Sequence, residues 1–322
     1  MRRPFQKLLI YLVLLGGSAV FMLPLAWMVS TALKPIDQTM TMPPVWIPYQ
    51  YDAPLNGKMI PVTKVAKNPD GTIDVIAQES GERFTVKTDA LTWHVAPRWE
   101  NFGRAIKAMG SFTTYLRNTV ILCVLTVIGT VCSSAVTAYG FSRIDWPGRD
   151  KLFGVALATM MVPFPVLMVP LYSLFRSLGW IGTLQPLWVP TFCATAFNVF
   201  LLRQFFRTIP NDLSDAARID GCGEFRIFWQ VILPLARPAL VVVAVLQFLY
   251  TWNDFLGPLI FLTDQSDFTL ALGLQAYQSR QGGTEWHYLM AASTLVVLPV
   301  VVLFFAAQRA LIEGISMTGL KA

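Results

Sequence analysis

The stretch SDAARIDGCGEFRIFWQVILPLARPAL, from Ser214 to Leu240, lies between two long apolar segments of the chain. It is too polar to cross a bilayer, yet small and apolar residues recur in it at i, i+3, i+4 and i+7, the spacing of one helix face. Two such runs follow each other: Leu213, Ala216, Ala217 and Asp220, then Phe225, Phe228, Trp229 and Ile232. The stretch therefore predicts two short amphipathic helices outside the bilayer.

The two helices are expected to meet at Gly221, because glycine readily takes the left-handed backbone conformation that ends a helix. Asn211 is predicted as the N-cap of the first helix, and Pro234 is expected to end the second. Such a pair forms a compact knob. It suits docking into a groove on another protein or lying on a lipid surface, and periodicity alone does not separate the two.

The composition indicates an integral membrane protein. Of the 322 residues, 54% are hydrophobic and only 14% are charged, whereas an ordinary soluble domain carries roughly a quarter charged residues. The net charge of +6 does not indicate nucleic-acid binding, because the charges cluster at the ends of apolar segments rather than on one basic face. The four cysteines show no CxxC spacing and are interpreted as small apolar side chains.

A helix needs about 20 apolar residues to cross a bilayer. Six stretches qualify: Leu8–Leu33, Leu116–Gly140, Leu152–Phe175, Leu184–Leu202, Ala239–Leu262 and Leu289–Leu311. The first is too long for the core of a signal peptide and contains Pro24, so we interpret it as an uncleaved anchor.

Lysine and arginine residues set the expected orientation. If the N-terminus lies inside, the two short outer loops hold only Arg176 and Arg280, and most other basic residues near span ends face the cytoplasm. Both termini and the knob are therefore predicted to be cytoplasmic.

Two features inside the spans indicate a polar path. Pro163, Pro165 and Pro170 interrupt the third span, and broken helices usually face protein or a water-filled path. In the fifth span, an ionisable residue is a functional candidate by default. The candidate path residues are Gln247, Trp252, Asn253 and Asp254. A kinked packing helix and a helix-packing role for Asp254 are the alternatives.

Residues 49–96 have a different pattern from the rest of the chain. GTIDVIAQ and ERFTVKTD alternate apolar and polar residues, with Gly71 and the triplet ESG as turn signals. We expect a small β-rich insert on the extracytoplasmic side, either as a docking surface for a soluble partner or as an insertion without a role of its own.

Motifs for catalysis are absent from the sequence. There is no GxxxxGK[ST] phosphate loop, no HExxH, no GxSxG and no paired Cys/His ligands. We therefore expect no catalytic residue, no metal site and no cofactor bound by this chain.

The knob resembles the EAA motif of ABC-importer permeases, whose pattern is EAA, three residues, G, nine residues and I-x-LP. The matching positions are Asp215, Ala216, Ala217, Gly221, Leu233 and Pro234, with Asp215 in place of Glu and Val231 in place of Ile. PRWENFGRAI, YLRNTV, MMVPFPVLMVPLY, WNDFLGPLIFL and MTGLKA are similar to the carbohydrate-uptake branch, in the position of the maltose permease G subunit.

The resemblance implies an all-α integral membrane protein with six transmembrane helices of the type I ABC importer permease fold. Residues 1–48 would hold the first span and the start of the outer loop, and 49–96 the insert. The core, 97–322, would carry the coupling helices at 211–233 and the C-terminal tail. The insert is the chief departure from the family pattern.

The resemblance also implies a function, which is translocation of a di- or oligosaccharide across a prokaryotic inner membrane by alternating access. Partners would be a second permease, two ATP-binding subunits holding ATP and Mg, an extracytoplasmic binding protein and lipid. The coupling motif, with Arg218 and Asp220 at its rim, would contact the ATPase. A second contact would come from the tail residues Ser316, Met317, Thr318, Gly319, Leu320 and Lys321.

Other classes of protein remain as alternatives. An ion-coupled secondary transporter should show inverted repeats, and the sequence has no such symmetry. A membrane-anchored adhesion or sensor protein would not need six spans. Within the family, the cargo could instead be a polyol, a polyol phosphate or another polar solute.

Overall fold

The computed structural model describes residues 2–279 and 285–319. The chain divides into two compact units. The first unit comprises Met1–Gly110 and Tyr277–Val296, and the second comprises Ser111–Ala276 and Val297–Ala322. Each is described separately below.

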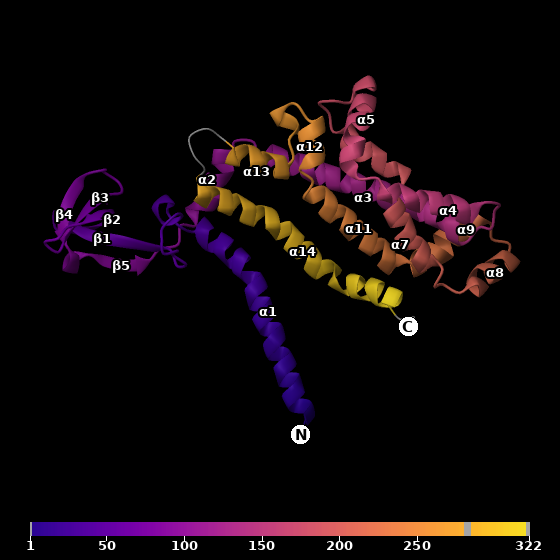
Figure 1. The fold of residues 1–322 in the computed structure, drawn as a ribbon, viewed down its shortest axis with the longest axis horizontal. Helices are drawn as coiled ribbons and strands as arrows, with labels where there is room; N and C mark the ends of the chain where they lie inside the picture. Colours follow the sequence, from indigo (N-terminus) through magenta and orange to yellow (C-terminus); the bar gives the residue numbers. More distant parts are fainter. Residues whose placement is uncertain (1, 280–284, 320–322) are drawn as a thin grey trace. The chain divides into compact units, whose positions relative to one another are not determined.

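The first unit contains the apolar helix α1 (Arg2–Ala32), a five-stranded sheet and α2 (Glu100–Met109), together with the first part of α14 (Trp286–Gly319) (Figure 1). The strands are β1 (Tyr49–Leu55), β2 (Lys58–Lys67), β3 (Thr72–Ala77), β4 (Arg83–Lys87) and β5 (Thr92–Val95). All pairs are antiparallel, in the order β4-β3-β2-β1-β5. A sheet thus occupies the segment whose alternation predicted strands.

Local turn chemistry and one apolar face explain this sheet. Asn56 and Gly57 both have positive φ, as a two-residue hairpin turn between β1 and β2 requires. One face buries a core of its own, made of Ala53, Val62, Ile73, Val75 and Val86. Among the residues that the structure describes, every member of this hydrophobic core lies within the segment 49–96.

Polar contacts within the first unit attach the sheet to α1 and α2. Arg98 Nη2 donates hydrogen bonds to Gln50 Oε1 and Gln78 Oε1, both at 2.7 Å. Asn101 Nδ2 donates to the carbonyl oxygens of Ala32 and Lys34, at 2.8 and 2.9 Å. The sheet is therefore held at the point where α1 ends and α2 begins.

The second unit is built around α3 (Phe112–Ser142), which packs against α7 (Ala196–Phe206) and α11 (Arg237–Trp252). The other helices of this unit are α4 (Arg149–Ala158), α5 (Phe164–Ser177), α6 (Gln185–Trp188), α8 (Asn211–Ile219), α9 (Glu224–Ile227), α10 (Leu233–Leu235) and α12 (Leu256–Phe261), with α13 (Leu270–Gln278) mostly within it. Gly129 permits close packing on α3, because a Cβ there would lie 2.5 Å from Thr191 Oγ1.

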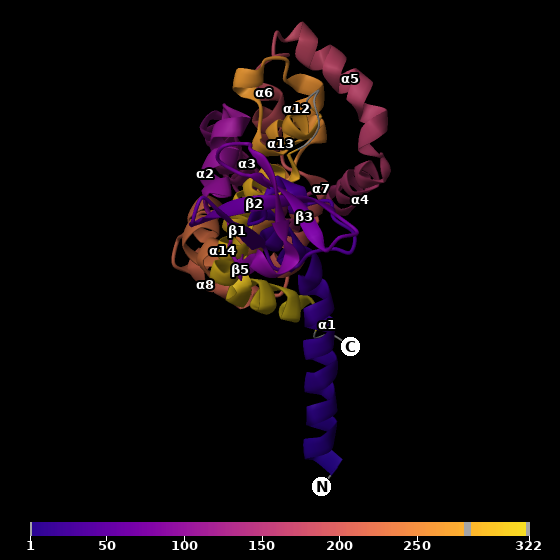
Figure 2. The same cartoon turned by 90° about the vertical axis from the view of Figure 1, so that its left-hand side faces the viewer.

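Several expected spans are broken. The axes of α4 and α5 differ by 98° across a break at Val162 and Pro163, and α5 turns away from α4 in both views (Figures 1 and 2). The prolines explain this break, since each removes a backbone donor. The fifth expected span, Ala239–Leu262, consists of α11 and α12 with a gap between them.

The number of spans depends on how the bent helices are counted. In the described residues, four helices are long and apolar enough to cross a membrane: those covering Gln6–Ala32, Phe112–Ser142, Gln185–Phe206 and Trp286–Ala310. Two bent pairs, one from Arg149 to Ser177 and one from Glu224 to Trp252, bring the number to six if each pair is one span.

Candidate functional site

The turn that follows α8 has a specific backbone geometry. Gly221 has φ +79° and donates its N–H to Arg218 O at 3.0 Å, while Cys222 N–H reaches Ala217 O at 2.9 Å. These two bonds form a Schellman motif, in which a left-handed residue satisfies the free carbonyls at a helix end. The predicted role of Gly221 as the helix-ending residue agrees with this geometry.

Arg218 connects the two sides of this turn. Its Nη1 lies 2.7 Å from Asp215 Oδ1 within α8, and its Nε lies 2.9 Å from Glu224 Oε1 at the start of α9. The hydrogen bond to Glu224 raises the pKa of Arg218, which keeps the guanidinium charged. Glu224 Oε2 in turn accepts a 2.5 Å hydrogen bond from the hydroxyl of Tyr139 on α3. A continuous polar chain therefore runs from Asp215 to α3.

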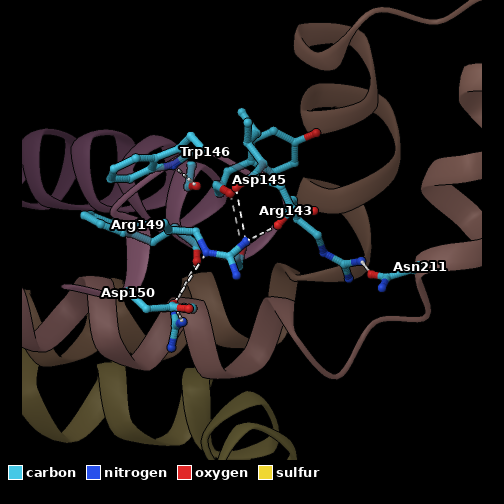
Figure 3. Close-up of polar contacts among 12 residues, drawn as sticks. Arg143, Asp145, Trp146, Arg149, Asp150 and Asn211 are labelled. Atoms are coloured by element: carbon cyan, nitrogen blue, oxygen red, sulfur yellow. Dashed lines mark hydrogen bonds and ion pairs between the residues drawn. The ribbon is translucent and has the colours of Figure 1, made fainter. Parts of the chain in front are cut away.

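A second link, through Arg143, holds the start of α8 in place. Arg143 follows α3 directly, and its guanidinium donates to Asn211 Oδ1 at 2.6 Å (Figure 3). It also donates to the carbonyl oxygens of Phe206 and Ile209. The sequence alone predicted no site role for Arg143, Tyr139 or Glu224. A basic residue at a helix C-terminus was the only local signal, and it does not identify the partners.

The expected N-cap at Asn211 is wrong. α8 begins at Asn211 itself, and no side chain caps this helix. The side-chain oxygen of Asn211 instead accepts a hydrogen bond from Arg143. The expected end at Pro234 is also wrong by one residue, since α10 runs on to Leu235.

The inner side of the knob belongs to the core of the second unit. Ala217, Ile227, Phe228 and Ile232 are buried in one cluster with side chains of α3 and α7. The rings of Phe228 and Tyr139 lie 5.1 Å apart. Leu233 packs partly against the same cluster, while Pro234 is exposed.

The outer side of the knob is apolar and exposed. Ile219, Phe225 and Trp229 are 87, 79 and 62% exposed, and Ala216 and Asp220 are exposed beside them. The predicted stripe of Phe225, Phe228, Trp229 and Ile232 is thus divided between the outer and inner sides. A π-helical turn at Phe228–Ile232 interrupts the α-helical spacing on which the prediction relied.

The candidate path residues lie in different surroundings. Gln247 and Trp252 are buried on α11, and Gln247 Nε2 donates to Thr251 Oγ1, which lies 2.9 Å from Thr126 Oγ1 of α3. Asn253 is exposed and donates to Leu249 O. Asp254 Oδ1 accepts from Gly257 N at 3.0 Å, so it stabilises the start of α12. Gln247, Asn253 and Asp254 thus bond to three different partners, Thr251, Leu249 and Gly257.

The predicted tail contact falls partly outside the described residues. Ser316 to Gly319 continue α14 as helix, without described side chains, and Leu320 and Lys321 lie beyond the described range. In the described residues no group of His, Cys, Asp and Glu side chains is arranged to hold a metal ion.

Comparisons with known proteins all match components of membrane transport systems. A family model, "Binding-protein-dependent transport system inner membrane component", matches residues 126–317. The arabinooligosaccharides transport system permease protein AraQ of Halalkalibacterium halodurans is 35% identical over 222 residues, which cover 69% of this chain and 79% of AraQ. The diacetylchitobiose uptake system permease protein NgcG of Streptomyces coelicolor is 36% identical over 222 residues, which cover 68% of this chain and 73% of NgcG.

One solved structure is similar over nearly the whole chain. It is a chain of a bacterial ABC transporter involved in the import of the acidic polysaccharide alginate. The match has a TM-score of 0.71 at 20% sequence identity, and covers 96% of this chain and 98% of that chain. At 20% sequence identity, the similarity shows a shared fold and nothing further.

Proposed function

Since the chain belongs to the family of binding-protein-dependent transport system inner membrane components, and is a permease subunit rather than an enzyme, we propose that it imports an oligosaccharide. The resemblance drawn from the EAA-like stretch is thereby confirmed. The proposed cargo follows from two relatives, the arabinooligosaccharides permease AraQ and the diacetylchitobiose permease NgcG.

The knob is the proposed docking site for an ATP-binding subunit. Its exposed apolar side chains, Ile219, Phe225 and Trp229, stand beside the small Ala216, which lets another surface approach closely. Large apolar side chains exposed together mark interaction sites. This exposed apolar surface beside the turn at Gly221 is the single observation that carries the proposal.

The residues around the knob receive distinct roles. Gly221 sets the angle between α8 and α9, and Ala217 anchors α8 to the core. Asp215 and Arg218 join α8 to Glu224 and Tyr139, so a pull on the knob would be transmitted to α3. Asp220 lies at the rim, and Leu233 and Pro234 lead into α11. Ser316–Lys321 remain proposed as a secondary contact.

We propose the following transport cycle. ATP and Mg bound by two partner ATPases close the ATPase pair, which moves the knobs and switches the pathway between outward- and inward-facing states. This chain binds neither ATP nor Mg. A second permease completes the pathway, and a binding protein delivers the sugar from outside.

The membrane arrangement is also a proposal. We place six spans in the inner membrane, with the bent pair Arg149–Ser177 as the third crossing and α11 with α12 as the fifth, and with both termini and the knob in the cytoplasm. The sheet of residues 49–96 then lies outside, within reach of the binding protein. Of the path candidates, exposed Asn253 has an amide oxygen available to a sugar hydroxyl, whereas Asp254 serves the start of α12.

The proposal is tested by purifying the chain from native membranes, identifying its partners and assaying ATPase activity with and without candidate oligosaccharides. We expect a second permease, an ATPase and a binding protein in the eluate, and a stimulating oligosaccharide names the cargo. A chain that purifies alone and transports with an ion gradient contradicts the proposal.

A further inference from the structure

The end of α1 at Ala32 carries a pair of tryptophans. The candidate span Gln6–Ala32 has 27 residues, so it is about 40 Å long at 1.5 Å per residue, whereas the hydrocarbon core of a bilayer is about 30 Å thick. Such a helix extends beyond the core into the headgroup regions. In its last two turns, the ring of Trp27 packs against that of Trp46, with centroids 4.9 Å apart, and Ser30 Oγ donates to Trp46 O. Tryptophan is enriched at the headgroup level of membranes.

Backbone hydrogen bonds hold both ends of the sheet segment close to the end of α1. The N–H of Arg98 donates to Leu33 O at 2.9 Å, and the N–H of Ala96 donates to Pro48 O at 3.1 Å. The strand β5 ends at Val95, one residue before the second of these bonds. The edge of the sheet formed by β5 is therefore attached where α1 leaves the membrane.

Large apolar side chains are exposed beside these bonds. Ile47, Trp93, Val95 and Trp99 are 62, 67, 54 and 66% exposed, and each lies within three residues of one of the bonded backbone groups. We call these four residues the apolar patch. Exposed apolar groups gathered in this way mark sites of contact with a protein or a membrane.

The strand β5 has an apolar face and a polar face. Because side chains alternate along a strand, Trp93 and Val95 lie on one face of the sheet, and Thr92 and His94 lie on the other. On the polar face, His94 Nδ1 lies 3.2 Å from Asp52 Oδ2 of the neighbouring strand β1. The same division between an apolar and a polar face allows an amphipathic helix to lie flat on a bilayer.

The position of β5 within the first unit fits this division. The strand order places β5 at one edge of the sheet. In both views β5 lies below β1 and β2, on the side toward which α1 runs from its end at Ala32 (Figures 1 and 2). The edge that carries Trp93 and Val95 is therefore the edge on the membrane side of the sheet.

We propose that the sheet lies against the outer surface of the membrane, with the apolar patch among the phospholipid headgroups. The patch continues from Trp46, which packs directly on the span, and this continuity identifies lipid as the partner. Asp52 and His94 then face water. The inference rests on the membrane orientation proposed above and not on the cargo.

This contact would give the sheet a mechanical role. In the most apolar part of α1, none of the residues is buried against the rest of the described chain, so packing within the chain does not fix the depth of this helix. Tryptophan anchors at the membrane surface fix the depth and tilt of a span. The sheet would therefore hold α1 at a set depth.

The test uses the complete importer in nanodiscs of phosphatidylethanolamine and phosphatidylglycerol, with the binding protein present. The photoreactive residue p-benzoylphenylalanine replaces Trp93, His94 or Lys87 in turn, all of which are exposed. His94 is the control on the opposite face of β5. Lys87 is the control at the other edge of the sheet, on β4, four strand spacings or about 19 Å from β5. A sizing column checks assembly, and mass spectrometry identifies the adducts formed on irradiation.

We expect phospholipid adducts with the probe at position 93, a lower yield at position 94 and none at position 87. Adducts to the binding protein in place of lipid at position 93 overturn the proposal, as do equal lipid yields at the three positions or no adduct at position 93. Lipid adducts at position 93 in a complex that no oligosaccharide stimulates support the inference and contradict the proposed cargo alone.

Discussion

The sheet in the first unit and the knob in the second unit are both polar segments attached to apolar helices, but their cores differ. The sheet buries Ala53, Val62 and Val75 among its own residues. The knob buries Ala217, Phe228 and Ile232 against α3 and α7. A segment with its own core can change without disturbing its neighbours, whereas one that shares its core transmits any displacement. The difference suits an accessory role for the sheet and a coupling role for the knob.

The comparison is tested most strongly at two glycines with nearly the same φ. Gly221 in the knob and Gly57 in the sheet have φ +79° and +78°, and a Cβ at either would meet no atom within 4 Å. Valine at either position is strained by about 1–2 kcal/mol or more, because an L side chain disfavours this region. We expect Gly221→Val to abolish sugar-dependent ATPase activity and transport, while Gly57→Val keeps both.

Transport in proteoliposomes and assembly on a sizing column provide the two measurements. Gly221→Val should still assemble, since open space surrounds the new side chain. Normal transport by Gly221→Val, or equal loss in both variants, removes the distinction between the two regions.

The next effect concerns the buried side chains. Ile232 and Val75 are fully buried, the first in the shared core and the second in the sheet core. Ile232→Ala should cost about 2–5 kcal/mol of unfolding free energy through loss of contact and cavity formation. Because this cavity lies between the knob and α3, thermal inactivation of transport should shift to lower temperature. Val75→Ala should increase proteolysis of residues 49–96 and leave transport unchanged.

How far the sequence predicts these regions depends on how many positions apart along the chain the contacting residues lie. Gly221 and the strands around Gly71 could be read from neighbouring residues, because helix ends and strand alternation are local properties. The buried side of α9 could not be predicted from neighbouring residues, because packing against α3 and α7 determines it. The pairs Arg143–Asn211 and Tyr139–Glu224 join residues 68 and 85 positions apart, with no local pattern to connect them.

The contact made by Asp254 joins residues close together in the sequence. Its carboxylate accepts from the backbone of Gly257, three residues on, which is a helix-start pattern visible in the sequence. The sequence interpretation named Asp254 as a path candidate, with a helix-packing role as the alternative, and did not identify this contact with Gly257. The pair Asn56-Gly57 likewise marked the β1–β2 hairpin and was not used.

A smaller effect is expected at two exposed tryptophans. Trp229 on the knob is 62% exposed and Trp93 on the sheet is 67% exposed. Exposed tryptophans often dominate interface energies, with losses of about 2 kcal/mol or more on truncation. Trp229→Ala should therefore weaken binding of the ATPase subunit about thirtyfold, whereas Trp93→Ala should have no effect on that binding. Biolayer interferometry with purified ATPase measures both. Equal affinities for the wild type and Trp229→Ala place the ATPase elsewhere.

The smallest expected effect distinguishes a polar contact that connects the knob to α3 from a polar contact on the surface of the sheet. Glu224→Gln removes the charge between Arg218 and Tyr139, and Asp52→Asn removes the charge beside His94 in the sheet. Both sites are partly exposed, so each change should alter stability by less than about 1 kcal/mol. Transmission requires a connection rather than a large energy. We therefore expect Glu224→Gln to lower the number of sugars imported per ATP, and Asp52→Asn to leave it unchanged. If both variants keep the wild-type ratio, the shared hydrophobic core alone carries the movement from the knob to α3.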